Sequence, residues 1–137
     1  MKEKIAILFI FFSTYCFTQL STNPSPFEVN QSVTITVDIN SSSTNCNGFN
    51  SPNKVYMHAG IGNDSQPWGF SVIGNWGQDD GVGLMSDNGD GLWSITIIPN
   101  EYFGLTAEQA VSATKMGLVF RNEDGTQELK DQGCSDF

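Results

Sequence analysis

The sequence predicts an all-β fold: an immunoglobulin-like antiparallel β-sandwich with one short helix. Apolar and polar residues alternate along several short segments, which is the pattern of strands that bury one face. Gly, Asn and Asp residues separate these segments at short intervals and supply the turns between them. About 119 residues remain after the N-terminal segment described below, which is enough for one pair of packed sheets and too few for two domains.

The first two strands are expected at residues 32–39 and 54–61. One face of the first carries only apolar side chains: Val33, Ile35, Val37 and Ile39. A polar loop without apolar periodicity follows over residues 40–53. The inner face of the second strand is also apolar: Val55, Met57 and Ala59. Tyr56 and His58 occupy the alternate positions, so we expect both to point away from the core.

Three further strands are expected in the middle of the chain, at residues 69–76, 83–86 and 92–99. The last of these has the clearest alternation, and its apolar face comprises Trp93, Ile95 and Ile97. A Gly-Asp-Gly sequence directly before it supplies a turn.

One helix and a hairpin are expected in the last third of the chain. Thr106 followed by Gln109 matches a capping box, which predicts a short helix over residues 106–113. Residues 115–121 then form a strand with an apolar inner face: Met116, Leu118 and Phe120. An Asn-Glu-Asp-Gly turn returns the chain as a partner strand over residues 126–130.

Residues 1–18 have the order of a secretory signal peptide: a charged start, an apolar run and a short polar end. The apolar run of roughly eight residues is far shorter than the twenty or so that a membrane helix needs. We therefore expect cleavage near Thr18 and a domain over residues 19–137 that is secreted or held at the cell surface, without insertion into a membrane. Residues 134–137 look like the start of a final strand, which suggests a domain cut short at its C-terminal end.

The formal net charge is −9 and the sequence pI is about 4.2. Few cations follow the signal segment: Lys54, Lys115, Arg121 and Lys130. A surface that binds phosphates needs clustered Lys and Arg, so the composition argues against nucleic acid as a partner.

Two cysteines follow the signal segment, Cys46 and Cys134. An even number of cysteines in an exported domain indicates a disulfide. The alternative is two unpaired thiols.

The residues needed for catalysis are not gathered in any recognisable pattern. His58 is the single histidine, and the chain contains no Gly-x-Ser-x-Gly nucleophile sequence, so we expect that the domain is not itself an enzyme. Most acidic residues lie in Gly-rich turns, and four of them are candidate calcium ligands: Asp79, Asp80, Asp87 and Asp90. Their spacing differs from the twelve-residue calcium loop, so no cofactor is expected and structural calcium is the open alternative.

Trp68 and Trp76 lie in polar, Gly- and Asn-rich stretches rather than in alternating strands. An indole that faces solvent can stack on the apolar C–H face of a pyranose ring, while polar side chains nearby, such as His58 and Gln78, bind its hydroxyls. The alternative is that both indoles lie at the edge of the core.

A family resemblance rests on segments that recur in order: Val55-Tyr56-Met57-His58, Gly74-Asn75-Trp76, Met85, Gly91-Leu92-Trp93-Ser94-Ile95-Thr96-Ile97, Gly117-Leu118-Val119-Phe120-Arg121-Asn122 and Lys130-Asp131-Gln132-Gly133-Cys134-Ser135-Asp136-Phe137. Over roughly residue 55 to the end, the chain resembles the small starch-binding modules of bacterial amylases, and also N-terminal domains of larger exported bacterial glycan-processing proteins. The resemblance implies an immunoglobulin-like sandwich in which His58 with Tyr56, and Trp76 ahead of Met85, form the sugar-binding platform.

One departure concerns a further aromatic residue that family members carry before the closing turn. The chain has Glu128-Leu129-Lys130 there, and Trp68 is the candidate replacement. We expect a non-catalytic module that binds a polysaccharide, namely a starch-like α-glucan, and that is joined to downstream domains of a longer secreted protein such as a glycoside hydrolase. The alternative is a structural spacer or assembly domain of a secreted enzyme or adhesin.

Overall fold

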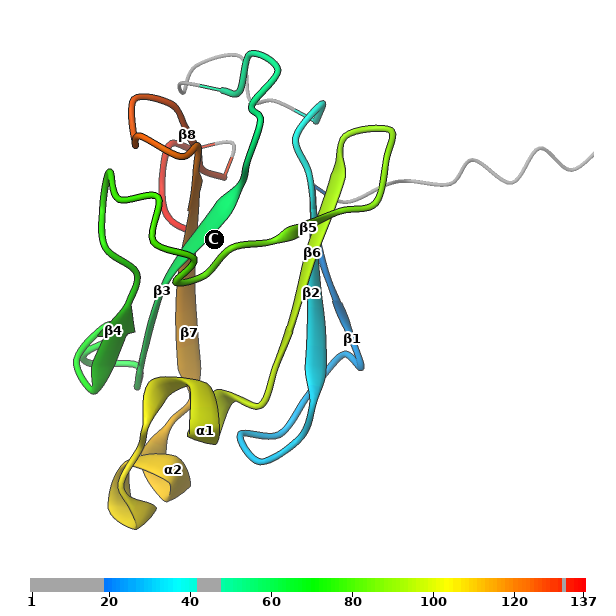
Figure 1. Ribbon diagram of the computed structural model, residues 1–137. Helices are drawn as coiled ribbons and strands as arrows, with labels where there is room; N and C mark the ends of the chain where they lie inside the picture. The colour runs from blue at the N-terminus through cyan, green and yellow to red at the C-terminus, as the bar shows by residue number, and fades with distance from the viewer. Residues whose placement is uncertain (1–18, 42–47, 132) are drawn as a thin grey trace, which may run out of the picture.

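The computed structural model describes residues 19–41, 48–131 and 133–137. Two antiparallel four-stranded sheets pack face to face (Figure 1). The strand order is β1-β2-β6-β5 in the first sheet and β4-β3-β7-β8 in the second. The predicted all-β antiparallel sandwich is therefore confirmed.

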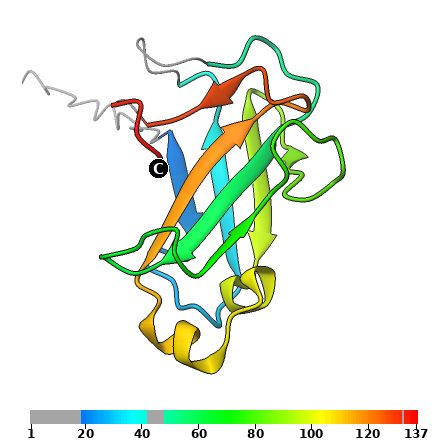
Figure 2. The same cartoon turned by 90° about the vertical axis from the view of Figure 1, so that its left-hand side faces the viewer.

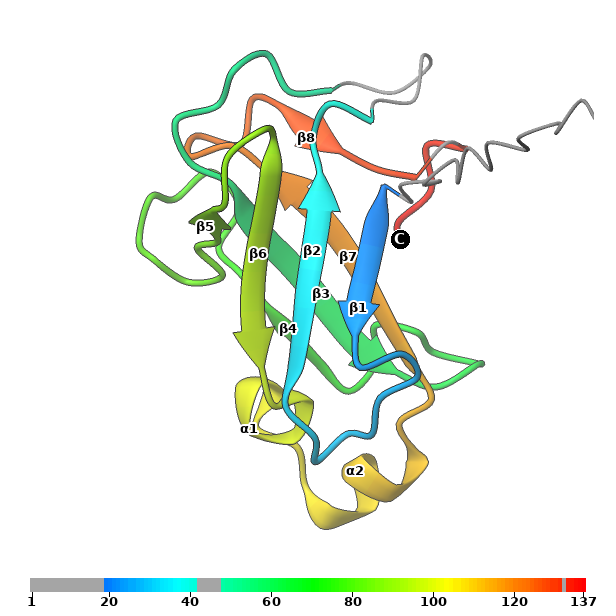
Figure 3. The same cartoon turned by 90° about the vertical axis from the view of Figure 1, so that its right-hand side faces the viewer.

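The first sheet is built on β2 (Val33–Asp38), which lies between β1 (Leu20–Asn23) and β6 (Leu92–Ile97) (Figure 3). β5 (Ser86–Asp87) pairs with the other side of β6. The hydroxyls of Thr34 and Thr96 lie 2.8 Å apart across the β2–β6 pair.

The second sheet is built on β3 (Tyr56–Gly62) and β7 (Lys115–Arg121), which pair along their whole lengths (Figure 2). β4 (Ser71–Ile73) pairs with the free side of β3, and β8 (Glu128–Leu129) pairs with the end of β7. The β7–β8 hairpin is the return strand predicted from the Asn-Glu-Asp-Gly turn.

The core lies between the sheets and is made of the side chains that the alternation pattern assigned to it. The members with no exposed surface come from both sheets: Val33, Ile35, Val37, Val55, Met57, Ala59, Phe120 and Leu129. Trp93 and Ile97 of β6 are each 6% exposed in the same cluster. The period-two pattern therefore identified the inner faces of β2, β3, β6 and β7 correctly.

Two short helices close one end of the sandwich, at the bottom of Figure 1, where one was expected. α2 (Ala107–Ser112) begins with the predicted capping box, since Thr106 accepts from the Gln109 amide and the Gln109 side chain accepts from the Thr106 amide. α1 (Pro99–Phe103) was missed because it is one turn long and has no side-chain cap. Pro99 suits the start of α1, because amides in the first turn have no partner within the helix and proline has no amide hydrogen. Gly104 suits its end, because the backbone there has a left-handed φ of 62°.

Three strand predictions need correction. The strand expected at 69–76 is confined to β4, because Gly74 turns the backbone with a φ of 120°. The strand expected at 83–86 is displaced to β5, and Leu84 makes only an isolated bridge to Tyr56. β1 was missed, because its four residues carry too little alternation to stand out. The predicted signal peptide, residues 1–18, lies outside the described residues.

Candidate functional site

The candidate site lies on the outer face of the second sheet, away from the core. Tyr56 and His58 point to this face from β3, as predicted, because Met57 and Ala59 between and beside them point inward. Gly60 is the next residue of β3 on this face, and Gly117 of β7 lies directly opposite it.

Trp68 lies flat on these two glycines. A Cβ atom added to Gly60 would lie 2.1 Å from Cε3 of the indole, and one added to Gly117 would lie 2.4 Å from its Nε1. Atoms from both rings of the indole are therefore in contact with the sheet backbone, so the sheet covers one face of the indole. Any larger residue at either position would lift the indole from the sheet.

His58 lies between the two predicted tryptophans. Its ring centroid is 5.8 Å from that of Trp68, with 28° between the planes, and 5.6 Å from that of Trp76, with 85° between the planes. Burial lowers the pKa of the His58 imidazole from its ordinary value of 6.5, and the charge of Arg121 lowers it further. The imidazole is therefore neutral at pH 7. We call His58, Trp68 and Trp76 the aromatic face.

Trp76 is the most accessible member of the aromatic face, with 45% of its surface exposed. Its indole leans against the β7–β8 turn, where a Cβ added to Gly125 would lie 2.8 Å from Nε1. Since the Trp68 plane is close to that of His58 and the Trp76 plane is nearly perpendicular to it, the two indoles are steeply inclined to each other.

Tyr56 is on the predicted side of the sheet but is only 1% exposed, which corrects its expected place in the sugar platform. The guanidinium of Arg121 covers its ring at 4.4 Å, and its hydroxyl donates to the Asp79 carboxylate. A ring that is covered in this way has no face for a ligand, so Tyr56 supports the site from beneath.

Arg121 is the residue that the sequence reasoning missed. It is fully buried, and it donates to four backbone carbonyls in two loops. Its position on β7 directly opposite Tyr56 was a usable signal, because a cation facing an aromatic ring across a strand pair is a recognisable pairing.

Three further predicted residues lie in the loop between β4 and β5. Gln78 is exposed, close in sequence to Trp76. Asp79 is held by Lys54 at 2.6 Å, and this hydrogen bond, followed by that from Tyr56, lowers the pKa of the Asp79 carboxyl. Asp80 accepts from the Asn75 amide at 2.7 Å, which lowers its pKa as well.

Of the other two calcium candidates, Asp87 ends β5 and Asp90 lies in the turn before β6. The Asp87 carboxylate accepts from the Gly89 amide at 2.8 Å, and Asp90 has a φ of 54°. Among the described residues, no three His, Cys, Asp or Glu side chains are grouped as a metal site. Structural calcium stays the open alternative to the expectation of no cofactor.

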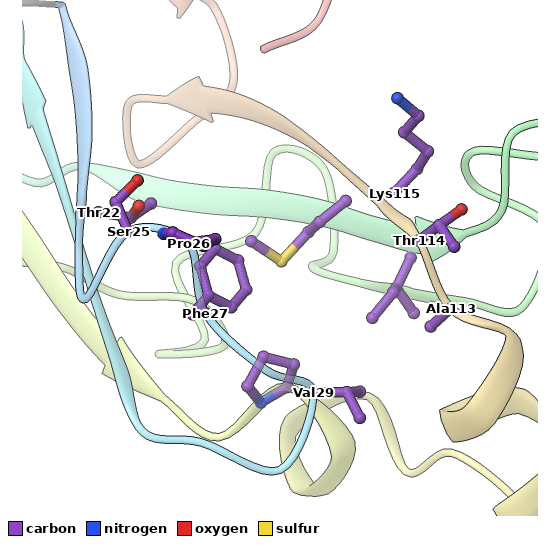
Figure 4. A pocket seen from close by; sticks show the side chains of 11 residues that line it. Thr22, Ser25, Pro26, Phe27, Val29, Ala113, Thr114 and Lys115 are labelled. Carbon is purple, nitrogen blue, oxygen red and sulfur yellow. The ribbon is translucent and has the colours of Figure 1, made fainter.

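A separate cavity of about 440 Å³ lies between the chain at β1 and the start of β7 (Figure 4). Phe27, Val29 and Met116 contribute apolar surface, and Thr22 and Thr114 lie on opposite sides of it. None of the predicted site residues lines this cavity.

Two sequence predictions, the disulfide and the absence of membrane insertion, concern parts of the chain that the structure does not describe in full. Cys46 lies outside the described residues, so its pairing with Cys134 stays a prediction. Over the ranges 19–41, 48–131 and 133–137, no helix has the length and apolar character required to cross a membrane.

Comparison with known proteins places the chain in a family without assigning it an activity. No curated protein matches the chain. One family model does match, over residues 20–129, which is well over half of the chain. The chain therefore belongs to the family described as Domain of unknown function (DUF8578).

Proposed function

We propose that this domain is a non-catalytic carbohydrate-binding module for a starch-like α-glucan, carried by a larger secreted protein. The observation that supports this most strongly is Trp76, an indole 45% exposed at the edge of a ring contact with His58. An exposed indole that packs against other aromatic rings offers an apolar surface, and the apolar face of a pyranose ring can cover that surface.

The support beneath the aromatic face is paired strand backbone, which favours binding. Trp68 rests on β3 and β7, the longest paired strands of the sheet. A ring that is already held in place loses little conformational entropy when a ligand covers it. Gln78, exposed in the adjacent loop, supplies an amide that can bond sugar hydroxyls.

The steep angle between the Trp68 and Trp76 planes bears on the shape of the ligand. Flat, ribbon-like β-1,4-glucans fit a row of coplanar rings, whereas a curved α-1,4-glucan turns successive sugar rings relative to one another. Two inclined indoles on either side of an imidazole suit the curved chain.

The alternative of a structural spacer would be favoured if both tryptophans were buried. Trp68 is half-buried, but Trp76 is not, so the geometry favours the binding module over the spacer.

Affinity electrophoresis in native gels that contain soluble starch tests the proposal. We expect starch to retard the wild-type domain, and Trp76→Ala to weaken the apparent affinity at least tenfold, about 1.4 kcal/mol, because the exposed stacking surface is removed. Val111→Ala is the matched control, since Val111 is an apolar residue 90% exposed on α2 and is not a member of the aromatic face.

A parallel gel with hydroxyethylcellulose separates a curved glucan from a flat one. Retardation in cellulose alone would contradict the proposed ligand. Unretarded migration of both wild type and Trp76→Ala in every gel would contradict the carbohydrate-binding function itself.

A further inference from the structure

We infer that Arg121 is a positioning residue for glycan binding, which holds Trp76 at the angle that the aromatic face requires. The inference rests on the proposed function and assigns to it a residue that touches no ligand. We call residues 74–79 the Trp76 loop.

The guanidinium of Arg121 joins the Trp76 loop to the β7–β8 turn. Its Nη2 donates to the carbonyls of Asn75 and Gln78, both at 2.8 Å. Its Nη1 donates to the carbonyls of Asn122 at 2.9 Å and Glu123 at 3.2 Å. One planar group therefore links two segments that are more than forty residues apart in the sequence.

Trp76 lies at the contact between the two segments that the Arg121 guanidinium joins. It falls between Asn75 and Gln78, whose carbonyls the guanidinium binds, and its indole leans on Gly125 in the opposite turn. A change in the distance between the Trp76 loop and the turn therefore changes the angle of the indole. A second tether acts on the same loop, because Asp79 bonds to the Tyr56 hydroxyl and to Lys54.

Arg121 is suited to this role by its chemistry. Burying its positive charge is tolerable because four carbonyl dipoles and the Tyr56 ring face the guanidinium. A lysine ammonium has three donors on a single atom and cannot reach two carbonyls on each side. The core cluster lies on the opposite face of the sheet, so the link serves the outer face rather than the packing between the sheets.

The test compares wild type with Arg121→Lys after incorporation of 5-fluorotryptophan, which gives one ¹⁹F signal for each tryptophan. The Trp76 signal is assigned with Trp76→Phe. We expect Arg121→Lys to shift or broaden the Trp76 signal. The signal of Trp93, a core residue on β6 of the first sheet, should not change. If the loop then spends about a tenth of its time in the binding conformation, starch affinity falls about tenfold.

Two further variants complete the experiment. Tyr56→Phe keeps the ring beneath the guanidinium and removes only the tether to Asp79, so a smaller change in the same signal and a loss of affinity of about threefold are expected. Lys115→Met removes an exposed ion pair with Asp64 and is the control that leaves both readouts unchanged.

The inference is overturned if Arg121→Lys folds and changes neither the Trp76 signal nor the affinity. If Arg121→Lys does not fold, Arg121→Gln takes its place, because the side-chain amide keeps a planar donor at this position, and an unchanged Trp76 signal in that variant overturns the inference. The ¹⁹F comparison needs no ligand. It therefore decides the positioning role even if starch does not retard the wild type, a result that overturns the proposed function alone.

Discussion

Gly60 and Gly117 show how much of the aromatic face depends on single residues. In most strands a glycine weakens the sheet, because it has no side chain to pack and loses more conformational freedom on folding. Here the cross-strand pair leaves a flat strip of backbone, and the Trp68 indole occupies the space that two side chains would otherwise fill. The two glycines contribute no side-chain packing themselves, but their absence of side chains lets the Trp68 indole pack in a fixed orientation.

His58 provides a prediction about pH at the same scale. Its pKa in the folded domain is below the ordinary value of 6.5, because burial and Arg121 disfavour the imidazolium. The unfolded chain therefore binds the proton more readily. The contribution of His58 to the free energy of unfolding is therefore fully present above pH 6.5 and is lost as the pH decreases from 6.5 through the folded-state pKa.

Urea unfolding of wild type and His58→Gln between pH 7.5 and pH 5 measures this effect. We expect the free energy of unfolding of the wild type to decrease over this range more than that of His58→Gln, which lacks the titrating group. All other titrating groups are present in both proteins, so the comparison isolates the imidazole. Parallel curves for the two proteins would show that the imidazole is as easily protonated in the folded domain as in the unfolded chain.

At the scale of elements, α2 is stabilised at its start more than along its length. The helix has six residues, none of them buried, and short helices are marginal in water on propensity alone. The capping box satisfies amides at its first turn through Thr106 and Gln109, with donor–acceptor distances of 2.9 and 3.2 Å.

We expect Thr106→Ala to lower the free energy of unfolding by about 1 kcal/mol, because the Gln109 amide loses its acceptor. Thermal or urea unfolding measures the change, and Thr106→Ser, which keeps the hydroxyl, should restore most of it. Thr114→Ala is a control for loss of a threonine at an exposed position after the helix. A Thr106→Ala protein as stable as the control would mean that the cap is replaced by water at no cost.

The accuracy with which the sequence pattern predicted each strand depends on the length of the strand. β2, β6 and β7 pair along six or seven residues with a regular alternation, and their inner faces were predicted correctly. β1, β4 and β5 have two to four residues each, and their limits depend on which neighbouring strand they pair with. A pattern with a period of two needs more residues than these elements have.

At the scale of the whole molecule, the predicted disulfide between Cys46 and Cys134 would join distant parts of the chain. It would close a loop of about ninety residues and stabilise the folded state by about 4 kcal/mol in the chain-entropy model. We expect the intact mass to be unchanged by thiol alkylation under non-reducing conditions, and the thermal midpoint to fall after reduction. Addition of two alkyl groups without reduction would show two free thiols instead.

The molecule has a cavity and an exposed aromatic face at different places. The cavity beside β1 and β7 lies in a different part of the sandwich from the aromatic face and shares no lining residue with it. The proposal for glycan binding therefore depends on a projecting ring surface rather than on an enclosed pocket, which suits a polymer that passes across the domain.

The sequence by itself determined the all-β class, the inner faces of the long strands and the start of α2. These features depend on residues within a few positions of one another, so alternation and the capping box reveal them. Only the tertiary structure decided that Tyr56 is covered, that Trp68 lies on Gly60 and Gly117, and that Arg121 links the Trp76 loop to the β7–β8 turn. Each of these contacts joins residues far apart in the chain, and local periodicity carries no information about which distant side chain will occupy the outer face of a sheet.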